Sequence, residues 1–174
     1  MTLEQLAAAI PAYAKDLKLN LSSIFQQTEL TPQQAWGAAV ACAYASRNQA
    51  VYEAILEAAE KQISAEAVQG AKAAAAIMGM NNIYYRALHI MKGEEYRTLP
   101  ARLRMTLIGN PGVDKTDFEL WSFAVSAVNG CGMCMDAHEA ELKKHGVSNV
   151  QIQTALRIAA VVNAVSRVVA AEAA

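Results

Sequence analysis

Residues 116–134 read TDFELWSFAVSAVNGCGMC and contain two helix signals separated by one turn. Thr116 and Glu119 have the spacing of a capping box, which predicts that a helix begins there. Asn129-Gly130 is a typical helix stop, and Cys131 then starts the next helix. Because the turn between them is short, the two helices fold back on each other. The stretch therefore predicts a helical hairpin with a Cys-x-x-Cys pair at its bend.

The rest of the chain has the composition of a helical protein. Aromatic residues make up 6% of the 174 residues, and only nine Gly and four Pro interrupt an Ala-rich sequence. Ala is the best helix former, whereas strands prefer aromatic and β-branched residues. We expect an all-α helical bundle that forms a single domain over residues 1–174. Capping and stop signals predict further helices from Thr31 to about Asn48, over Val51–Lys61, from Ser64 to about Ile90, over Pro100–Ile108, and from Ser148 to the C-terminus.

The chain is similar to itself at an offset of 85 residues. This offset places Trp36 on Trp121 and the capping box of residues 31–34 on that of residues 116–119. We interpret the match as an internal duplication, with pseudo-repeats of about residues 1–89 and 90–174. The alternative is a chance similarity between two Ala-rich helical segments. The offset pairs Cys131, Cys134 and His138 with Ser46, Gln49 and Glu53, so the reactive side chains occur only in the second half.

Charge and hydropathy exclude several classes of protein. The formal net charge is −1 and no basic run is present, which argues against nucleic-acid binding. A hydrophobic content of 54% excludes a disordered chain. No uninterrupted apolar run reaches the roughly 18 residues of a membrane span. The N-terminus lacks the basic segment and apolar core of a secretory leader. We therefore expect a cytoplasmic protein that binds neither membrane nor nucleic acid, in which three cysteines do not indicate a structural disulfide framework.

The Cys131/Cys134 pair is the strongest candidate for chemistry. A helix N-terminus carries partial positive charge and free N–H groups, and both stabilise a thiolate. Two cysteines three residues apart on a helical turn can close a disulfide with little backbone movement. The dithiol can therefore cycle between reduced and oxidised states.

His138 and Glu119 are candidates to move the thiol proton. His138 follows Cys134 by one helical turn on the same face, so geometry favours Cys134 over Cys131 as the group that it deprotonates. Glu119 lies on the preceding helix, from which it could orient His138 as the third member of a relay. The capping box explains a Glu at position 119 equally well, so the sequence leaves its role open.

Other reactive residues have simpler explanations. His145 suits a helix C-terminus, Cys42 suits a core of small residues, and the methionines suit core and pocket packing. His145 is about 10 Å beyond His138 along one helix. Cys131, Cys134, His138 and His145 therefore cannot all bind one zinc ion. An open three-ligand zinc site remains an alternative to the redox dithiol.

The spacing Glu119, eleven residues, Cys131-Gly132-Met133-Cys134, three residues, His138 resembles the alkyl hydroperoxide reductase D proteins of the carboxymuconolactone decarboxylase-like superfamily. The resemblance covers nearly the full chain and includes residues 17–21, 77–82 and 118–127. One departure is Met133, where some relatives place a His between the cysteines. We expect the absence of this His to affect the rate of the reaction and not the type of reaction.

The resemblance implies an all-helical fold with an internal duplication, assembled as a homo-oligomer that is trimeric in the best-known members. It implies that Cys134 attacks the peroxide and becomes a sulfenic acid, and that Cys131 resolves it as a disulfide. His138 and Glu119 match a proton relay, with a water between them, that deprotonates Cys134. The implied partners are organic hydroperoxides, a peroxiredoxin of the alkyl hydroperoxide reductase C type, and a dehydrogenase subunit whose dihydrolipoyl group is the external dithiol. No bound cofactor or metal is expected.

The resulting hypothesis is an antioxidant dithiol oxidoreductase, a thiol-dependent alkyl hydroperoxide reductase. One alternative is a disulfide electron-transfer adaptor without significant peroxidase activity of its own. A second is a lactone-acid lyase like the superfamily's decarboxylases, against which the cysteine pair argues. A third is a zinc-stabilised interaction module.

Overall fold

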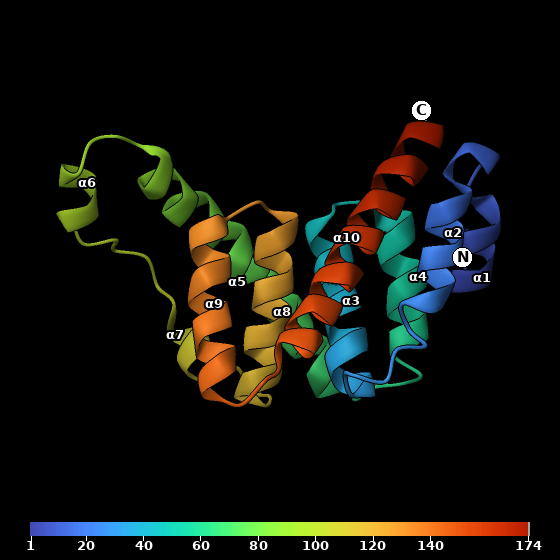
Figure 1. The fold of residues 1–174 in the computed structure, drawn as a ribbon, viewed down its shortest axis with the longest axis horizontal. Coiled ribbons are helices and arrows are strands. Elements are labelled where there is room, and N and C mark those ends of the chain that lie inside the picture. The colour runs from blue at the N-terminus through green and yellow to red at the C-terminus, as the bar shows by residue number, and fades with distance from the viewer. Residues whose placement is uncertain (174) are drawn as a thin grey trace.

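Ten α-helices and one short 3-10 helix make up most of residues 1–173, the part of the chain that this computed structural model describes (Figure 1). No strand occurs among these residues, so the expected all-α class is confirmed. The elements are α1 (Leu3–Ala9), η1 (Ala12–Ala14), α2 (Lys15–Ser23), α3 (Pro32–Ala45), α4 (Gln49–Ala59), α5 (Ala65–Ile90), α6 (Glu95–Thr98), α7 (Thr106–Gly109), α8 (Lys115–Val128), α9 (Gly132–Lys144) and α10 (Asn149–Glu172).

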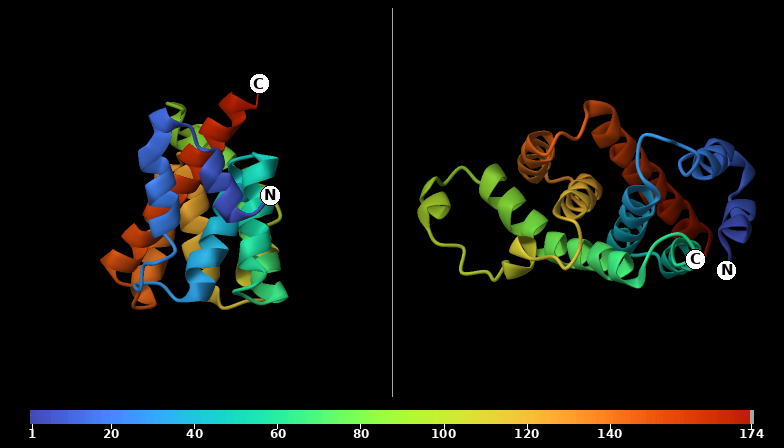
Figure 2. Two further views of the ribbon diagram at one scale, coloured as in Figure 1. Left: turned by 90° about the vertical axis from the view of Figure 1, so that its right-hand side faces the viewer. Right: turned by 90° about the horizontal axis from the view of Figure 1, so that it is seen from below.

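Helices α3 and α8 form the centre of the bundle. Both contact α5 and α10, while α9 packs on α8 and α4 packs on α3 (Figures 1 and 2). The buried side chains of α3 are mostly Ala, and those of α8 include Phe118, Leu120 and Trp121. Small residues on one helix and large residues on the other let the two axes approach closely while the core stays filled. This central pair positions α9 and its cysteines.

One close approach sets how α3 and α8 pack. A Cβ on Gly37 would lie 2.3 Å from Cε2 of Trp121, so only glycine fits there. The Trp121 indole is fully buried, and its Nε1 donates a hydrogen bond to the Gln34 carbonyl at 3.2 Å. Nearby, the Asp117 carboxylate accepts hydrogen bonds from the amides of Gln33 (2.7 Å) and Gln34 (2.9 Å). These contacts hold the N-terminal ends of the two helices together.

Several of the predicted helix starts are confirmed. Thr31 and Ser148 are the N-caps of α3 and α10, and both form complete capping boxes. Ser64 caps α5, which continues without a break to Ile90. The interior polar and glycine residues of α5 do not interrupt it, because tertiary packing outweighs their weak helix propensity.

Two details of the predicted helices are wrong. The N-cap of α8 is Asp114, whose side chain accepts a hydrogen bond from the Asp117 N–H at 3.1 Å, so Thr116 and Glu119 form no capping box. Asp is as good a cap as Thr, and its earlier position lets the helix begin at Lys115. The predicted helix over Pro100–Ile108 is reduced to α7, because Arg102 has a φ of 51°, which no right-handed helix contains.

The internal duplication stays a prediction. The helices α3, α4 and α5 have 14, 11 and 26 residues, and α8, α9 and α10 have 14, 13 and 24, which agrees with it. However, the capping box at Thr31 has no counterpart at Thr116, and the two tryptophans differ in their surroundings. Trp121 is buried at the centre, whereas Trp36 is only partly buried and stacks on Phe25 at 3.9 Å.

One described helix, α10, is long and apolar enough to cross a membrane by length and composition. In this structure its apolar face lies against α3 and α8, where Ile158, Val162 and Val165 are buried. The core helix of a bundle can be as long and as apolar as a membrane-spanning helix. The packing of α10 in the core therefore accounts for its apolar sequence.

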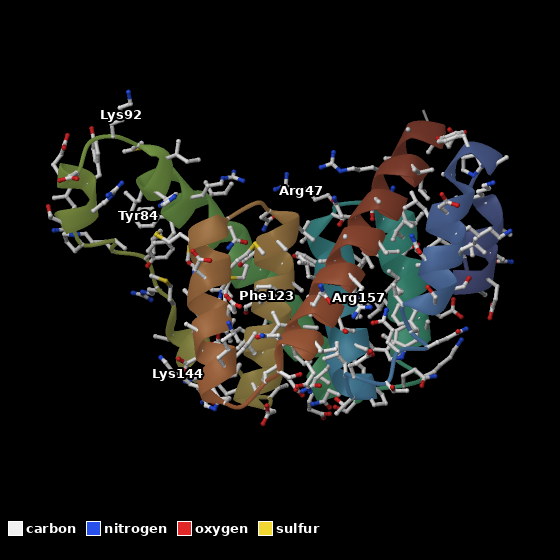
Figure 3. All side chains as sticks on the ribbon, viewed as in Figure 1. Arg47, Tyr84, Lys92, Phe123, Lys144 and Arg157 are labelled. Carbon is white, nitrogen blue, oxygen red and sulfur yellow. A yellow bond between two sulfur atoms is a disulfide. The ribbon has the colours of Figure 1, made fainter. Side chains whose placement is uncertain are left out.

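Residues 83–105, which we call the arm, project from the bundle. The arm comprises the C-terminal end of α5, the short helix α6 and the extended segment that leads back to α7 (Figures 1 and 2). Tyr84 and Lys92 lie on it, away from the other helices (Figure 3). Within the arm, Arg97 joins α6 to the end of α5, because its Nε donates a hydrogen bond to the Leu88 carbonyl at 3.2 Å.

Candidate active site

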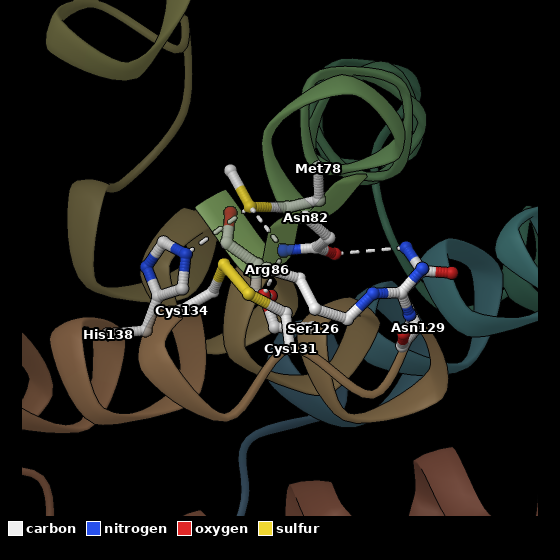
Figure 4. The surroundings of a disulfide bond; sticks show 9 residues. Met78, Asn82, Arg86, Ser126, Asn129, Cys131, Cys134 and His138 are labelled. Carbon is white, nitrogen blue, oxygen red and sulfur yellow. Dashed lines mark hydrogen bonds between the residues drawn. A yellow bond between two sulfur atoms is a disulfide. The ribbon is translucent and has the colours of Figure 1, made fainter. Parts of the chain in front are cut away.

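The cysteine pair lies at the turn between α8 and α9. Gly130 has a φ of 68°, a left-handed conformation that favours glycine, and it reverses the chain immediately after α8. Cys131 is the N-cap of α9, and its N–H donates a hydrogen bond to the Ser126 carbonyl at 3.0 Å. The two cysteines form a disulfide, with 5.3 Å between their Cα atoms (Figure 4). The predicted hairpin with two adjacent sulfurs at its bend is therefore present.

A buried carboxylate–imidazole pair stands beside the disulfide. Glu119 Oε2 lies 2.6 Å from His138 Nδ1, and the two side chains are only 7% and 13% exposed. The packing of α8 on α9 creates this contact. Because Asp114 caps α8, the alternative explanation of Glu119 as a capping residue is wrong. The two groups touch directly, whereas the family resemblance implied a water in the relay.

The other imidazole nitrogen contacts a methionine of α5. His138 Nε2 lies 3.3 Å from Sδ of Met78, a buried residue of α5. In this oxidised state Cys134 Sγ is bound to Cys131, so the predicted pairing of His138 with the Cys134 thiol belongs to the reduced state. Met78 thus links α5 to the histidine across the site (Figure 4).

A buried polar network holds the turn that carries Cys131. Asn82 donates a hydrogen bond to Ser126 Oγ at 2.9 Å and accepts one from the Asn129 amide at 2.9 Å. The Arg86 guanidinium donates to the Asn129 carbonyl at the end of α8 (Figure 4). A cation suits that position, because the last carbonyls of a helix carry partial negative charge. The network fixes the backbone just before the first cysteine.

A cavity of about 320 Å³ opens beside the second cysteine. Its polar lining residues are Asn81, Cys134 and His138. The remaining lining is apolar or aromatic and consists of Met78, Tyr85, Met105, Ile108, Met133 and Ala137. The cavity therefore suits a ligand with an apolar body and a small polar head.

The remaining candidate residues lie away from this cavity. Cys42 is fully buried in the core, and burial raises the pKa of its thiol. His145 is the C-cap of α9, as its sequence position predicts, and its Nε2 lies 3.3 Å from Glu141 Oε1. Among residues 1–173, no group of three or more His, Cys, Asp and Glu side chains is arranged to hold a metal ion.

Sequence reasoning missed the contribution of α5 to the site. Met78 reads as a residue of core and pocket packing, and Tyr85 carries no prediction. Asn81-Asn82 reads as a weak point of a helix and as part of the resemblance over residues 77–82, with no role in the site. One signal was available, because two consecutive Asn in an Ala-rich helix are poor helix formers and need a reason to be there. The partners of Asn82, which are Ser126 on α8 and Asn129 at its C-cap, lie more than 40 residues away in the chain, beyond the reach of local patterns.

Comparison with known proteins gives two concordant results. The model of the carboxymuconolactone decarboxylase family matches residues 94–174. Over its full length, the chain is similar to proteins named alkyl hydroperoxide reductase AhpD. It is 59% identical over 174 residues to that of Hyphomonas neptunium, covering 100% of this chain and 97% of the relative. It is 58% identical over 172 residues to that of Maricaulis maris, covering 99% of each. For Rhodospirillum centenum the identity is 56% over 174 residues, covering 100% and 94%.

Proposed function

Because this chain belongs to the AhpD family of alkyl hydroperoxide reductases, we propose that it reduces organic hydroperoxides by a cycle of the Cys131/Cys134 dithiol. The observation that carries the proposal is the disulfide at the start of α9, with the Glu119–His138 pair beside it and an apolar cavity at Cys134. A nucleophile, a base with an orienting carboxylate and a substrate pocket are the parts that thiol peroxidase chemistry requires.

In the first half of the cycle, His138 takes the proton of the reduced Cys134 thiol, and Glu119 stabilises the imidazolium through Nδ1. The thiolate attacks the outer oxygen of R–O–O–H. An S–O bond forms, the O–O bond breaks, and the leaving alkoxide takes the proton from His138 to become the alcohol. Cys134 is then a sulfenic acid.

In the second half, the Cys131 thiol attacks the Cys134 sulfur. The S–S bond forms, and the hydroxyl group leaves with the thiol proton as water. An external dithiol then returns two electrons and two protons to the disulfide. We propose the dihydrolipoyl group of a dehydrogenase subunit as this reductant and a peroxiredoxin of the alkyl hydroperoxide reductase C type as a further electron acceptor, in the reducing cytoplasm.

The assay is consumption of cumene hydroperoxide with dihydrolipoamide as reductant. We expect Cys134→Ser to abolish turnover, and Cys131→Ser to stop after one turnover with a sulfenic acid on Cys134. The matched control is Cys42→Ala, which removes the buried third cysteine and should leave turnover unchanged. Undiminished turnover in Cys134→Ser would end the proposal.

A disulfide adaptor without peroxidase activity is distinguished by adding hydroperoxide alone to the reduced protein. Stoichiometric formation of the Cys131–Cys134 disulfide supports the peroxidase, whereas no reaction supports the adaptor. The matched family also includes decarboxylases by name, but a lactone-acid lyase has no use for a disulfide-forming pair.

We also propose that the protein is a homo-oligomer, a trimer by the family resemblance. The arm supports this proposal because it carries large apolar side chains without cover from the same chain. Ile90 is 70% exposed and Leu99 is 60% exposed. Ile83, Met91 and Tyr96 of the arm are exposed as well, and exposed large apolar side chains gathered on one segment favour an interface.

A further inference from the structure

Asn81 is placed on the cavity wall by the geometry of α5. Met78, Asn81 and Tyr85 follow one another at helical spacing, so they share one face of the helix, and all three line the cavity at Cys134. Asn82 and Arg86, on the adjacent stripe, instead bind Ser126 and Asn129 at the end of α8. Of the two consecutive asparagines, one therefore holds the backbone of the site and the other faces the space where a substrate must enter.

The two asparagines differ in how their amides are satisfied. The Asn82 side chain is fully buried and uses both its amide nitrogen and its oxygen in hydrogen bonds. Asn81 is only 5% exposed, yet its Oδ1 has no hydrogen-bond partner among residues 1–173. Buried side-chain acceptors without a partner are uncommon in folded proteins, and each needs an explanation. A ligand in the cavity that donates a hydrogen bond to Asn81 Oδ1 supplies that explanation.

We propose that Asn81 is a substrate-binding residue, whose Oδ1 accepts the hydrogen bond of the O–H group of an organic hydroperoxide. This inference rests on the proposed peroxidase function. An organic hydroperoxide carries one O–H donor, and it sits on the outer oxygen, the atom that the Cys134 thiolate attacks. Asn81, Cys134 and His138 line the same cavity, so a hydrogen bond to Asn81 holds that oxygen at the nucleophile.

The apolar lining selects the rest of the substrate. Met105, Ile108 and Met133 offer a second hydroxyl no acceptor stronger than a thioether sulfur. The sulfur of Met105 already accepts a hydrogen bond from the Tyr85 hydroxyl at 3.8 Å. All three residues pack against an alkyl or aryl group. Hydrogen peroxide has two O–H donors and no apolar body, so it makes only part of these contacts. The cavity thus selects hydroperoxides with a bulky apolar group and one hydroxyl donor.

Binding to the disulfide form tests the hydrogen bond without turnover. The probes are 2-phenylpropan-2-ol, the alcohol product of cumene hydroperoxide, and its methyl ether, which has the same apolar body and no O–H. We expect the oxidised protein to bind the alcohol about five- to tenfold more tightly than the ether, as one hydrogen bond allows. Asn81→Leu, nearly equal in shape, and Asn81→Ala should each remove this preference. Asn20→Ala, an exposed asparagine of α2, is the matched control.

Kinetics provides the second readout. With cumene hydroperoxide, Asn81→Leu should raise KM about five- to tenfold, while the pH profile of Cys134 alkylation stays that of the wild type, because Glu119 and His138 are intact. An alcohol-to-ether preference that survives in both Asn81 variants, as it would if Oδ1 bound only water, overturns the inference. If the preference disappears in the variants but the wild type consumes no hydroperoxide, the proposed function fails and the binding role stands.

Discussion

Glu119 is held against His138 by the packing of two helices, and the pair is nearly excluded from water. A carboxylate in that position fixes the imidazole orientation and stabilises its protonated form. In the proposed cycle, both effects help His138 to take the proton of the Cys134 thiol. The proposed chemistry therefore depends on a residue 15 positions before the nucleophile in the chain.

Replacing the carboxylate tests this dependence. In Glu119→Gln the amide no longer stabilises the imidazolium, so we expect hydroperoxide turnover to fall about 100-fold. In the reduced protein, the pKa of the Cys134 thiol, measured from its alkylation rate against pH, should rise, and His138→Ala should give the same shift. Glu57→Gln, which changes a half-exposed carboxylate on α4, is the control. Identical alkylation profiles in wild type and Glu119→Gln would contradict the relay.

Cys42 should be inert in the native protein. Its side chain is fully buried, and burial raises the pKa of its thiol. After reduction, brief alkylation at neutral pH should label Cys134 and leave Cys42 unlabelled until the protein is unfolded, as mass spectrometry of the peptides would reveal. Labelling of native Cys42 would contradict its placement.

The same burial gives Cys42 a pH-dependent effect on stability. Above about pH 8.5 the thiol ionises in the unfolded state but not in the folded state. The unfolded state then binds fewer protons, so the free energy of unfolding decreases as pH rises further. We expect this slope to be weaker in Cys42→Ala. Equal slopes in the two proteins would show that Cys42 titrates alike in both states.

Asn81 also bears on stability. A buried acceptor without a partner costs about 1–3 kcal/mol, so Asn81→Leu should raise the free energy of unfolding by a similar amount in urea denaturation. Such a gain, together with weaker substrate binding, is the usual exchange of stability for function at a binding site. A loss of stability would indicate that the Asn81 amide has a structural partner.

Helices α3 and α8 are kept close by a glycine opposite a tryptophan. In Gly37→Ala the new methyl group would lie 2.3 Å from the Trp121 indole, so the helices must separate or the ring must move. We expect the free energy of unfolding to fall by about 1–3 kcal/mol. Gly79→Ala is the control, because a Cβ there meets nothing within 4 Å and should stabilise α5 by about 0.5–1 kcal/mol. Equal effects of the two substitutions would argue against the close packing.

The turn between α8 and α9 depends on α5 as a third element. Arg86 and Asn82 bind the end of α8 through Asn129, immediately before Gly130 and Cys131. The same helix supplies Met78 to His138 and Asn81 to the cavity. One long helix thus carries the groups that support the cysteine backbone and those that line the cavity.

At the scale of the whole molecule, the arm carries large apolar side chains that nothing else in residues 1–173 covers. If it is an interface between copies, light scattering should give a multiple of 18.6 kDa for the wild type. The double substitution Ile90→Asp and Leu99→Asp should give a monomer, since charged residues cannot be buried unpaired. Leu19→Asp, on a side chain of α2 that is 66% exposed, is the control. A monomeric wild type would refute the oligomer.

Local features of the sequence were sufficient for most of the long helices and for part of the site. Caps at Thr31, Ser64 and Ser148 act within four residues, so they could be recognised without knowing the fold. The same locality places Cys134 and His138 on one helical face. Even a local signal can fail where two caps compete, and Asp114 prevails over Thr116 in this way.

Contacts between helices required the tertiary structure. The meeting of Glu119 with His138, and of Met78 and Asn81 with the cavity, depends on how α5, α8 and α9 are rotated about their axes. That rotation is set when α5 and α8 pack on α3 and α9 packs on α8 and α5, which involves residues far apart in the chain. Spacing along one helix decides which side chains share a face, whereas packing between helices decides what that face meets.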